Sequence, residues 1–264
     1  MYGVKGKVGL LVPAGNRVIL PEFYRIDPEG MAFFETRMII EGSWISEDSN
    51  FAMIENAARG LNELKVCRVE LCVLACTATS FLKGKGWDEA FTRKALEETG
   101  IPATTTVLSI LEALAFLNVK KVAVATPWHS EINQKAVSYL QGNGYDVVRV
   151  YSEPLDRITV NDQWPDFAQR LAQKADHEAA EAVCLFATDL RTIDILSPAE
   201  KILGKPVISS NQSILFNVLR ILGHNQTLPG YGSLLENSWQ VAEKGIFGRL
   251  LKNAQMQGPR NPEE

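Results

Sequence analysis

Cys76 is the residue of this chain whose type and position are best suited to chemistry. It directly follows a strand-like apolar run and precedes a run of small, mostly hydroxyl residues at 77–80. A thiol between a strand and a helix start is expected to have a lowered pKa, so its thiolate is available as a nucleophile or a base. A buried, inert role is the alternative for any free cysteine, and we expect it for Cys67, Cys72 and Cys184.

A second segment repeats the pattern around Cys76 without its cysteine. In the first copy, an apolar run ending at Pro13 is followed by the run that ends at Cys76. In the second copy, a run ending at Pro127 is followed, at nearly the same separation, by one that ends at Ala187. This duplication predicts two similar α/β lobes with one site in the cleft between them. Cys76 then lies on one wall, and Ala187 occupies the position of a second thiol on the other.

Polar side chains follow the predicted strands, at the edge where parallel α/β sheets bind ligands. The Asn16 amide can bind a substrate carboxylate or cap a helix, and the Trp128 ring can wall the cleft or simply pack. We expect Asp189 and Asp194 to begin helices rather than to act as catalysts. Arg191 can attract a carboxylate or form a surface ion pair.

Short β-rich apolar runs alternate with segments of helical periodicity. We expect strands at residues 8–12, 69–75, 122–125, 147–150 and 183–186. We expect helices at residues 50–64, 87–99, 107–117, 131–142, 164–174 and 212–222. The alternation predicts an α/β fold of two pseudo-symmetric lobes, each a parallel sheet flanked by helices. The first lobe is expected to span residues 1–115 plus about 212–264, and the second residues 116–211.

Composition and charge argue against several classes of function. The 264 residues carry a net charge of −4 and no Lys/Arg run, which argues against binding to nucleic acids or membrane surfaces. No apolar run approaches the roughly 20 residues of a membrane span, and the N-terminus lacks a signal-peptide core, so we expect a cytoplasmic protein. The four cysteines form no paired framework and the three histidines lie away from them, so we expect neither disulfides nor a metal site.

Six stretches of the chain together resemble the aspartate/glutamate racemase superfamily, in particular its branch of maleate cis–trans isomerases and arylmalonate decarboxylases. They lie in the expected order at residues 12–16 (VPAGN), 76–80 (CTATS), 125–128 (ATPW), 187–194 (ATDLRTID), 206–212 (PVISSNQ) and 229–232 (PGYG). The resemblance implies two pseudo-symmetric lobes, chemistry without a cofactor, and a small dicarboxylate held between one cysteine from each lobe.

The resemblance also implies roles for residues of this chain. Cys76 takes the position of the nucleophile that adds to the double bond of maleate, and Asn16 takes a carboxylate-binding position. The other substrate-binding positions that it implies are Thr77, Ala78, Thr79, Ser80, Trp128, Asn161, Thr188, Ser210 and Asn211. In the isomerases, rotation about the new single bond and elimination then give fumarate.

Two residues depart from the pattern of that branch. Trp128 replaces the usual Tyr, which removes a hydroxyl donor and fills space. Ala187 replaces the expected second cysteine, so a racemase that needs an acid and a base on opposite faces of one carbon would lack one of them. Decarboxylation and covalent isomerisation each need only one thiol. One hypothesis is that Ala187 is a disabling replacement of a native cysteine.

The leading prediction is a cofactor-independent isomerase of a small maleate-like dicarboxylate, with Cys76 as nucleophile or base. One alternative is a malonate-type decarboxylase with Cys76 as proton donor. Others are a two-cysteine amino-acid or hydroxy-acid racemase inactivated at Ala187, and a carboxylate-binding protein without catalytic activity. We expect a homo-oligomer, a dimer or a tetramer, because symmetric assemblies are the commonest state of soluble oligomers.

Overall fold

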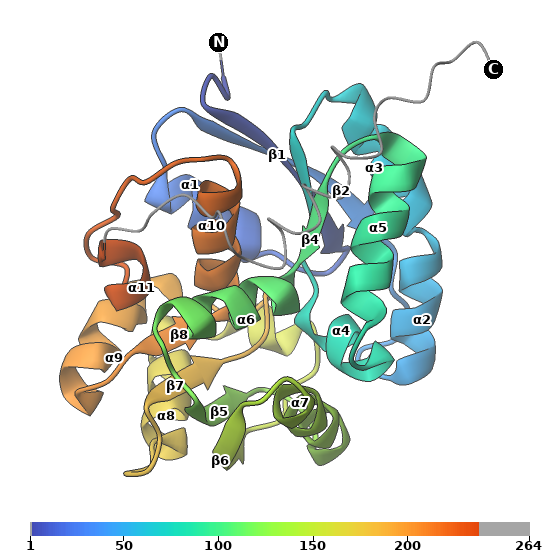
Figure 1. Ribbon diagram of the computed structural model, residues 1–264. Coiled ribbons are helices and arrows are strands. Elements are labelled where there is room, and N and C mark those ends of the chain that lie inside the picture. The colour runs from blue at the N-terminus through green and yellow to red at the C-terminus, as the bar shows by residue number, and fades with distance from the viewer. Residues whose placement is uncertain (1, 238–264) are drawn as a thin grey trace, which may run out of the picture.

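Two sheets of four strands each form the centre of the computed structural model, which describes residues 2–237 (Figure 1). The first sheet has the strand order β2-β1-β3-β4, and the second has the order β6-β5-β7-β8. Every strand pair is parallel. The predicted α/β fold with two pseudo-symmetric parallel sheets is therefore confirmed.

The five predicted strands form close to their predicted positions, and three further strands join them. The first sheet contains β1 (Gly6–Pro13), β2 (Met31–Met38), β3 (Leu71–Leu74) and β4 (Ala103–Thr105). The second contains β5 (Lys121–Thr126), β6 (Asp146–Ser152), β7 (Ala182–Leu185) and β8 (Val207–Ser209). Strand β2 was not predicted, because its apolar residues come first and its polar residues follow, without the strict alternation that marks a half-buried strand. It nevertheless pairs with β1 along its whole length.

Helices connect the strands and cover the sheets. They are α1 (Ile19–Ile26), α2 (Glu47–Glu55), α3 (Ala57–Val66), α4 (Thr77–Lys83), α5 (Trp87–Thr99), α6 (Thr106–Phe116), α7 (Ser130–Gly142), α8 (Pro165–Ala175), α9 (Leu196–Leu203), α10 (Ser210–Ile221) and α11 (Ser233–Glu236), with the 3-10 turns η1 (Thr159–Asp162) and η2 (Ile193–Ile195). All six predicted helices form, but the segment 50–64 is divided between α2 and α3 at Asn56.

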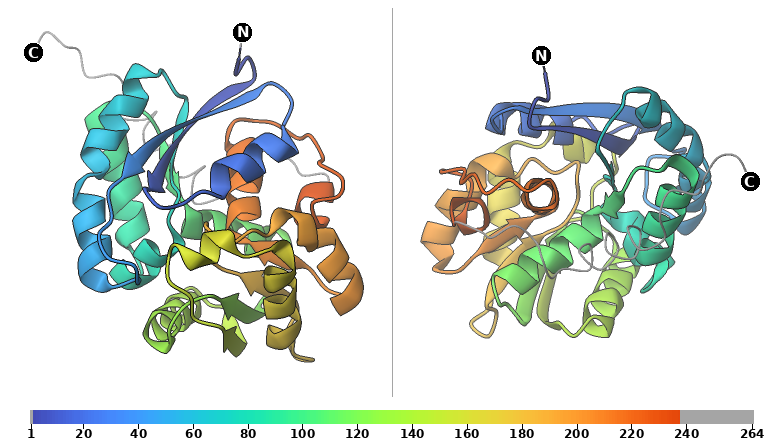
Figure 2. Two further views of the ribbon diagram at one scale, coloured as in Figure 1. Left: turned by 180° about the vertical axis from the view of Figure 1, so that it is seen from behind. Right: turned by 45° about the horizontal axis from the view of Figure 1, so that its top comes forward.

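One continuous apolar core joins the two sheets. It includes Val8 and Leu10 of β1 together with Val122 and Val124 of β5, all fully buried. Helix α6 lies between the sheets in Figure 1, and α10 packs against α6 and α1. A smaller core lies between the first sheet and the outer helices α2, α3 and α5, which form the blue-to-green group in Figure 2. Within residues 2–237 we find no helix long and apolar enough to cross a lipid bilayer.

The lobe boundaries stay a prediction. Residues 238–264, which the predicted first lobe includes, lie outside the described residues. Helix α10 follows the last strand of the second sheet, yet it contacts α1 of the first half of the chain.

The order of the strands explains where a ligand site can form. In each sheet the chain places its second strand on one side of the first strand, and its third and fourth strands on the other side. The order therefore reverses between β1 and β3 in the first sheet and between β5 and β7 in the second. The carboxyl ends of strands at such a reversal leave a crevice in which α/β proteins bind ligands. Asn16, Cys76, Trp128 and Ala187 follow these four strands in that order.

Candidate active site

A pocket lies where residues from both halves of the chain meet, and its space, counted with the open solvent at its mouth, is about 380 Å³. Seven of the predicted site residues line it: Asn16, Cys76, Thr77, Ala78, Trp128, Ala187 and Thr188. The other lining residues were not predicted to belong to the site: Pro13, Ile40, Ile45, Asn50, Arg157 and Asp189. Two other pockets in the described part of the chain have volumes of about 780 and 730 Å³. The smaller volume at Cys76 suits a ligand of few atoms.

Cys76 is held by contacts with α2 and α4. It is the extended residue directly before α4, and its thiol is buried, with 7% of the residue exposed. The Thr79 hydroxyl donates to Cys76 Sγ at 3.2 Å, and the thiol in turn lies 3.8 Å from Asn50 Oδ1. The side chain is therefore fixed with its sulfur at the pocket wall.

The predicted lowering of the pKa of Cys76 is wrong. Burial raises the pKa of the thiol above its ordinary value, and the negative charge of Asp189 raises it further. The hydrogen bonds from Thr79 and the positive charge of Arg157 act in the opposite direction without outweighing burial. A helix start was expected to stabilise the thiolate, but α4 has only seven residues, and the thiolate loses its water shell.

The other cysteines differ in exposure. Cys72 in β3 and Cys184 in β7 are fully buried, and burial raises the pKa of each thiol to about 12. Their expected burial is confirmed, and such thiols are inert at neutral pH. Cys67 is exposed at the end of α3, so the expectation that it is buried is wrong. The α3 helix ends there, and its last residue, Val66, is 83% exposed, so the chain at Cys67 has left the apolar core.

Asn16 supports the start of a helix and also lines the pocket. Its Oδ1 accepts hydrogen bonds from the backbone N–H groups of Val18 and Ile19, at 2.9 and 3.1 Å, at the start of α1. Its Nδ2 donates to the Thr188 hydroxyl at 3.0 Å, and that hydroxyl donates to the Ala75 carbonyl at 3.1 Å. Because an amide NH₂ has two protons, one proton of Asn16 is still available to a ligand.

Trp128 both packs and walls the pocket. Only 4% of the residue is exposed, and its ring meets the edge of the Phe81 ring at a centroid distance of 6.2 Å. The Asn133 amide donates to the Trp128 carbonyl at 3.0 Å, which fixes the turn after β5. The indole therefore forms a rigid apolar surface on the second-sheet side of the pocket.

The backbone at Ala187 is strained and is held by Ser210. Ala187 has a φ of 139°, in a region that favours glycine. Its backbone N–H donates to Ser210 Oγ at 3.2 Å, and Ser210 Oγ lies 2.9 Å from Thr77 Oγ1. Strain of this kind persists only where the surrounding structure fixes it, and it is concentrated at functional sites. Ser210 itself does not line the pocket but supports the two residues that do.

Three further predicted residues lie behind the pocket wall. Thr79 supports Cys76, whereas the Ser80 hydroxyl points to the buried Asp88 carboxylate at 2.6 Å. Asn211 Nδ2 donates to Glu22 Oε2 at 2.6 Å and to the Thr188 carbonyl at 3.0 Å. These side chains position the lining residues and do not themselves reach the pocket.

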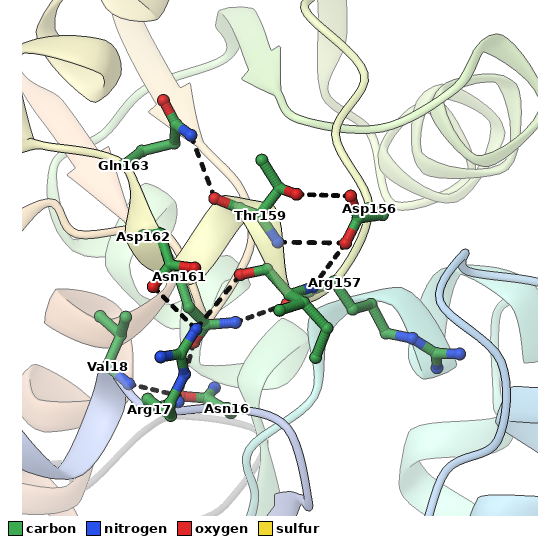
Figure 3. Close-up of polar contacts among 10 residues, drawn as sticks. Asn16, Arg17, Val18, Asp156, Arg157, Thr159, Asn161, Asp162 and Gln163 are labelled. Carbon is green, nitrogen blue, oxygen red and sulfur yellow. Dashed lines mark hydrogen bonds and ion pairs between the residues drawn. The ribbon is translucent and has the colours of Figure 1, made fainter.

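Asn161 likewise lies outside the pocket, where it positions Arg157. Asn161 Nδ2 donates to the Arg157 carbonyl at 2.5 Å, and Asn161 Oδ1 accepts from the backbone N–H of Arg17 at 2.8 Å. Figure 3 shows Asn161 between these two arginines, with the Arg157 side chain running away from η1 towards the segment before α2. Asn161 thus connects the segment before η1 to the loop after β1.

Arg157 is a lining residue that the sequence did not reveal. Only 8% of it is exposed, and its Nη2 donates to the backbone carbonyls of Glu41 and Gly42 at 2.6 and 2.5 Å. Its Nη1 is buried and has no hydrogen-bond partner among residues 2–237. A buried guanidinium with an unsatisfied arm is costly unless a ligand or a counter-charge completes it. Arg157 lies between β6 and η1, where no motif or periodicity marks it.

Asp189 also lines the pocket, although it was expected to begin a helix. It lies in the turn between β7 and η2, and Arg157 is the cation whose charge acts on it. Burial raises the pKa of its carboxyl to about 6. The related candidates Asp194 and Arg191 are engaged elsewhere. Asp194 pairs with Arg25 at 2.9 Å, and the Arg191 guanidinium lies 5.6 Å from the centre of the Trp164 ring.

Glu22 is a buried carboxyl next to the site that the sequence did not mark. Its Oε1 accepts hydrogen bonds from the backbone N–H groups of Thr192 and Ile193, at 2.6 and 3.0 Å. Burial nevertheless raises its pKa to about 7, since the bonds that favour the carboxylate do not outweigh the loss of water. The only signal in the sequence is the position of Glu22 in the amphipathic helix α1. It is a polar residue on the buried face of that helix, which otherwise consists of Ile19, Phe23 and Ile26.

Comparison with known proteins finds enzymes that this chain resembles. The family model described as arylmalonate decarboxylase matches residues 8–235. Arylmalonate decarboxylase from Bordetella bronchiseptica is 25% identical over 238 residues, covering 88% of this chain and 97% of that protein. Maleate isomerase from Pseudomonas putida is 23% identical over 248 residues, covering 88% and 98%.

Solved structures of both kinds of enzyme share the fold. A Cys-to-Ser mutant of Nocardia farcinica maleate cis-trans isomerase, with a covalently bound succinylcysteine intermediate, has a TM-score of 0.82 at 22% identity and covers 88% of this chain and 98% of its own. A double mutant of arylmalonate decarboxylase in the liganded form has a TM-score of 0.80 at 24% identity, covering 88% and 99%. At these identities the likeness concerns the fold.

Proposed function

Because the chain belongs to the arylmalonate decarboxylase family, we propose that it is an enzyme that isomerises a small maleate-like dicarboxylate about its double bond, with Cys76 as the nucleophile and without a cofactor. One observation carries this proposal. The Cys76 thiol and the buried guanidinium of Arg157, with an arm that lacks a partner among residues 2–237, line the same small pocket. A thiol and a carboxylate-binding cation are the two groups that covalent isomerisation of such a substrate needs.

The reaction follows from the chemistry of a thiol. Cys76 Sγ attacks one alkene carbon, so an S–C bond forms while the π bond breaks and its electron pair moves to the neighbouring carbon. That carbon takes up a proton, and the double bond has become a single bond about which the two carboxylates rotate. Loss of the same proton and of the thiolate then regenerates an alkene, now in the trans form. No atom is gained or lost overall.

The lining residues favour a substrate with two carboxylates. The free proton of the Asn16 amide and the Thr77 hydroxyl offer donors in the pocket, and Arg157 offers a cation there. Charge-assisted hydrogen bonds to a carboxylate are the strongest available to a protein in such a site. Ile40, Ile45 and Trp128 add an apolar wall to the pocket.

A malonate-type decarboxylase is a second candidate, favoured by the raised pKa of Cys76. A thiol that keeps its proton at neutral pH is suited to protonate the carbanion left when CO₂ departs. In that reaction the C–C bond to one carboxylate breaks, its electron pair stays on the central carbon, and Cys76 supplies the proton. Substituted malonates would then be the substrates.

Proton NMR with maleate and with phenylmalonate distinguishes the two reactions. Isomerisation predicts the fumarate signal, and decarboxylation predicts the phenylacetate methylene signal with release of CO₂. The Cys76→Ser variant is expected to lose either activity. The Cys67→Ser variant, which removes the exposed cysteine outside the pocket, is expected to keep it. Turnover of neither compound, or turnover that survives in Cys76→Ser, would contradict the proposed function.

A further inference from the structure

The structure offers a replacement for the thiol that is absent at position 187. Ala187 follows β7 as Cys76 follows β3, and its methyl group cannot transfer a proton. Two residues later in the same turn, Asp189 lines the pocket together with Cys76. We propose that Asp189 is the proton-transfer partner of Cys76: its carboxylate accepts the thiol proton, delivers it to the substrate carbon, and later removes it again. This inference rests on the proposed isomerisation.

Electrostatic coupling within the pocket supports this assignment. Cys76, Asp189 and Arg157 line one pocket, and their charges act on one another in pairs. The negative charge of Asp189 disfavours the Cys76 thiolate, so the thiol keeps its proton while Asp189 is ionised. Arg157 is the positive group that faces both, and it stabilises whichever of the two is ionised.

The step balances with that single proton. The S–H bond of Cys76 breaks and the proton passes to the Asp189 carboxylate, while the S–C bond forms at the first alkene carbon. The π electron pair moves to the second alkene carbon, which takes the proton from Asp189. After rotation, Asp189 removes the proton from this carbon, the C–S bond breaks, and the proton returns to Cys76. Neither an oxidant nor a second thiol is needed.

Other ionisable groups near the site are less suited to this role. The Glu22 carboxylate does not line the pocket, and it already accepts hydrogen bonds from Asn211, Thr192 and Ile193. His129 is exposed and lies against the Trp44 ring at a centroid distance of 4.6 Å. Asp189 is the one carboxyl group among residues 2–237 that lines this pocket.

The first arm of the test compares Asp189→Asn with Asp194→Asn, in which a carboxyl of the neighbouring η2 turn is removed outside the pocket. We expect Asp189→Asn to slow maleate isomerisation by about 10²- to 10⁴-fold, the usual contribution of a general acid–base group. We expect Asp194→Asn to leave the rate unchanged.

In the unmodified enzyme, kcat/KM is expected to fall as the pH drops below about 6, because protonated Asp189 cannot accept the thiol proton. Asp189→Asn is expected to lose this acid limb.

The second arm gives a readout that does not depend on turnover. Alkylation of Cys76 by iodoacetamide is followed against pH by peptide mass spectrometry in a Cys67→Ser background. Removal of the Asp189 charge is expected to lower the pKa of Cys76, so that Asp189→Asn is alkylated faster than the unmodified protein while it isomerises more slowly. A structural disturbance that exposes the buried thiol would raise the alkylation rate at every pH, whereas loss of the Asp189 charge shifts the pH midpoint of alkylation to lower values. Ala187→Cys introduced into Asp189→Asn is expected to restore part of the lost rate, since it supplies a thiol in the same turn.

Each outcome decides the question. If maleate is isomerised and Asp189→Asn retains the full rate with its acid limb, Asp189 has no part in proton transfer and only this inference fails. If the unmodified enzyme does not isomerise maleate, the proposed function fails instead. In that case an unchanged alkylation profile in Asp189→Asn separately overturns the coupling of Asp189 to Cys76.

Discussion

The side-chain amide of Asn211 donates a 2.6 Å hydrogen bond to the Glu22 carboxylate, and so joins α10, which follows the last strand, to α1, which follows the first. The other carboxylate oxygen of Glu22 holds the backbone of Thr192 and Ile193. The same Asn211 amide donates to the Thr188 carbonyl. One buried acid from the first half of the chain therefore fixes the turn that carries Ala187 and Asp189.

Glu22 makes the stability of the protein depend on pH. Its pKa is raised from 4.5 to about 7 in the folded state, so between these values the folded chain keeps a proton that the unfolded chain has lost. The free energy of unfolding therefore decreases as the pH rises from about 4.5 to 7 and levels off above that range. A shift of this size corresponds to about 3 kcal/mol. Glu22→Gln, which stays neutral at every pH, is expected to remove most of this slope.

Urea denaturation at a series of pH values between about 4.5 and 7.5 measures the Glu22 effect. Asp189 contributes a smaller slope of the same sign, because its pKa is also raised. Glu29→Gln is the matched control, since Glu29 is exposed and paired with Lys5 at 2.7 Å. An unchanged slope in Glu22→Gln would show that the folded protein does not hold this proton.

Arg157 is expected to determine affinity for the second carboxylate of the substrate. Arg157→Gln removes the charge and is expected to weaken maleate binding by about 10- to 100-fold, from the net value of a charge-assisted hydrogen bond. Arg157→Lys keeps the charge without the contacts to both the Glu41 and Gly42 carbonyls, and it is expected to recover part of the affinity.

Isothermal titration calorimetry of the Arg157 variants with maleate and with its monoamide tests this role. Affinity for the monoamide, which lacks the second charge, is expected to change little. Arg149→Gln, at an exposed position on β6, is the control. Equal losses for maleate and the monoamide would mean that Arg157 supports the pocket without recognising the charge.

Asn16 is expected to contribute to stability as well as to binding. Asn16→Ala removes the side-chain oxygen that accepts two backbone N–H groups at the start of α1, at a cost of about 1 kcal/mol. Asn62→Ala, on the exposed face of α3, is expected to be neutral or slightly stabilising because alanine favours the helix. Thermal unfolding of the two variants compares them directly. A stability of Asn16→Ala equal to that of Asn62→Ala would show that these hydrogen bonds have no energetic effect.

The duplicated strands and Cys76 could be predicted from the sequence because their signals are local. An apolar run followed by a small polar run marks the carboxyl end of a parallel strand wherever it occurs, and two such runs in the same order predict the two sheets. Seven predicted residues do line one pocket as a result. The pKa of Cys76 was predicted with the wrong sign, since it depends on how deeply the folded chain buries the thiol.

Long-range contacts explain what the sequence did not reveal. Arg157 reaches the pocket only because the backbone carbonyls of Glu41 and Gly42, from a distant segment, hold its guanidinium. Glu22 faces a turn that lies 170 positions further along the chain. Neither partner is marked in the sequence around these residues, so their roles follow from the assembled fold.

The continuous core between the two sheets restricts how a ligand enters. Parting the sheets as two rigid halves would expose the fully buried side chains shared by β1 and β5, at about 25 cal/mol for each Å² of apolar surface. The segment between β2 and α2 buries less, because Ile40 and Ile45 are only partly buried where they pack against the cores. It contributes Ile40 and Ile45 to the pocket wall, and its Trp44 is 46% exposed. Displacement of this segment would also withdraw the two carbonyls that hold Arg157. Its return over a bound substrate would restore both carbonyls to Arg157, so closing the pocket would also complete the charge-binding site.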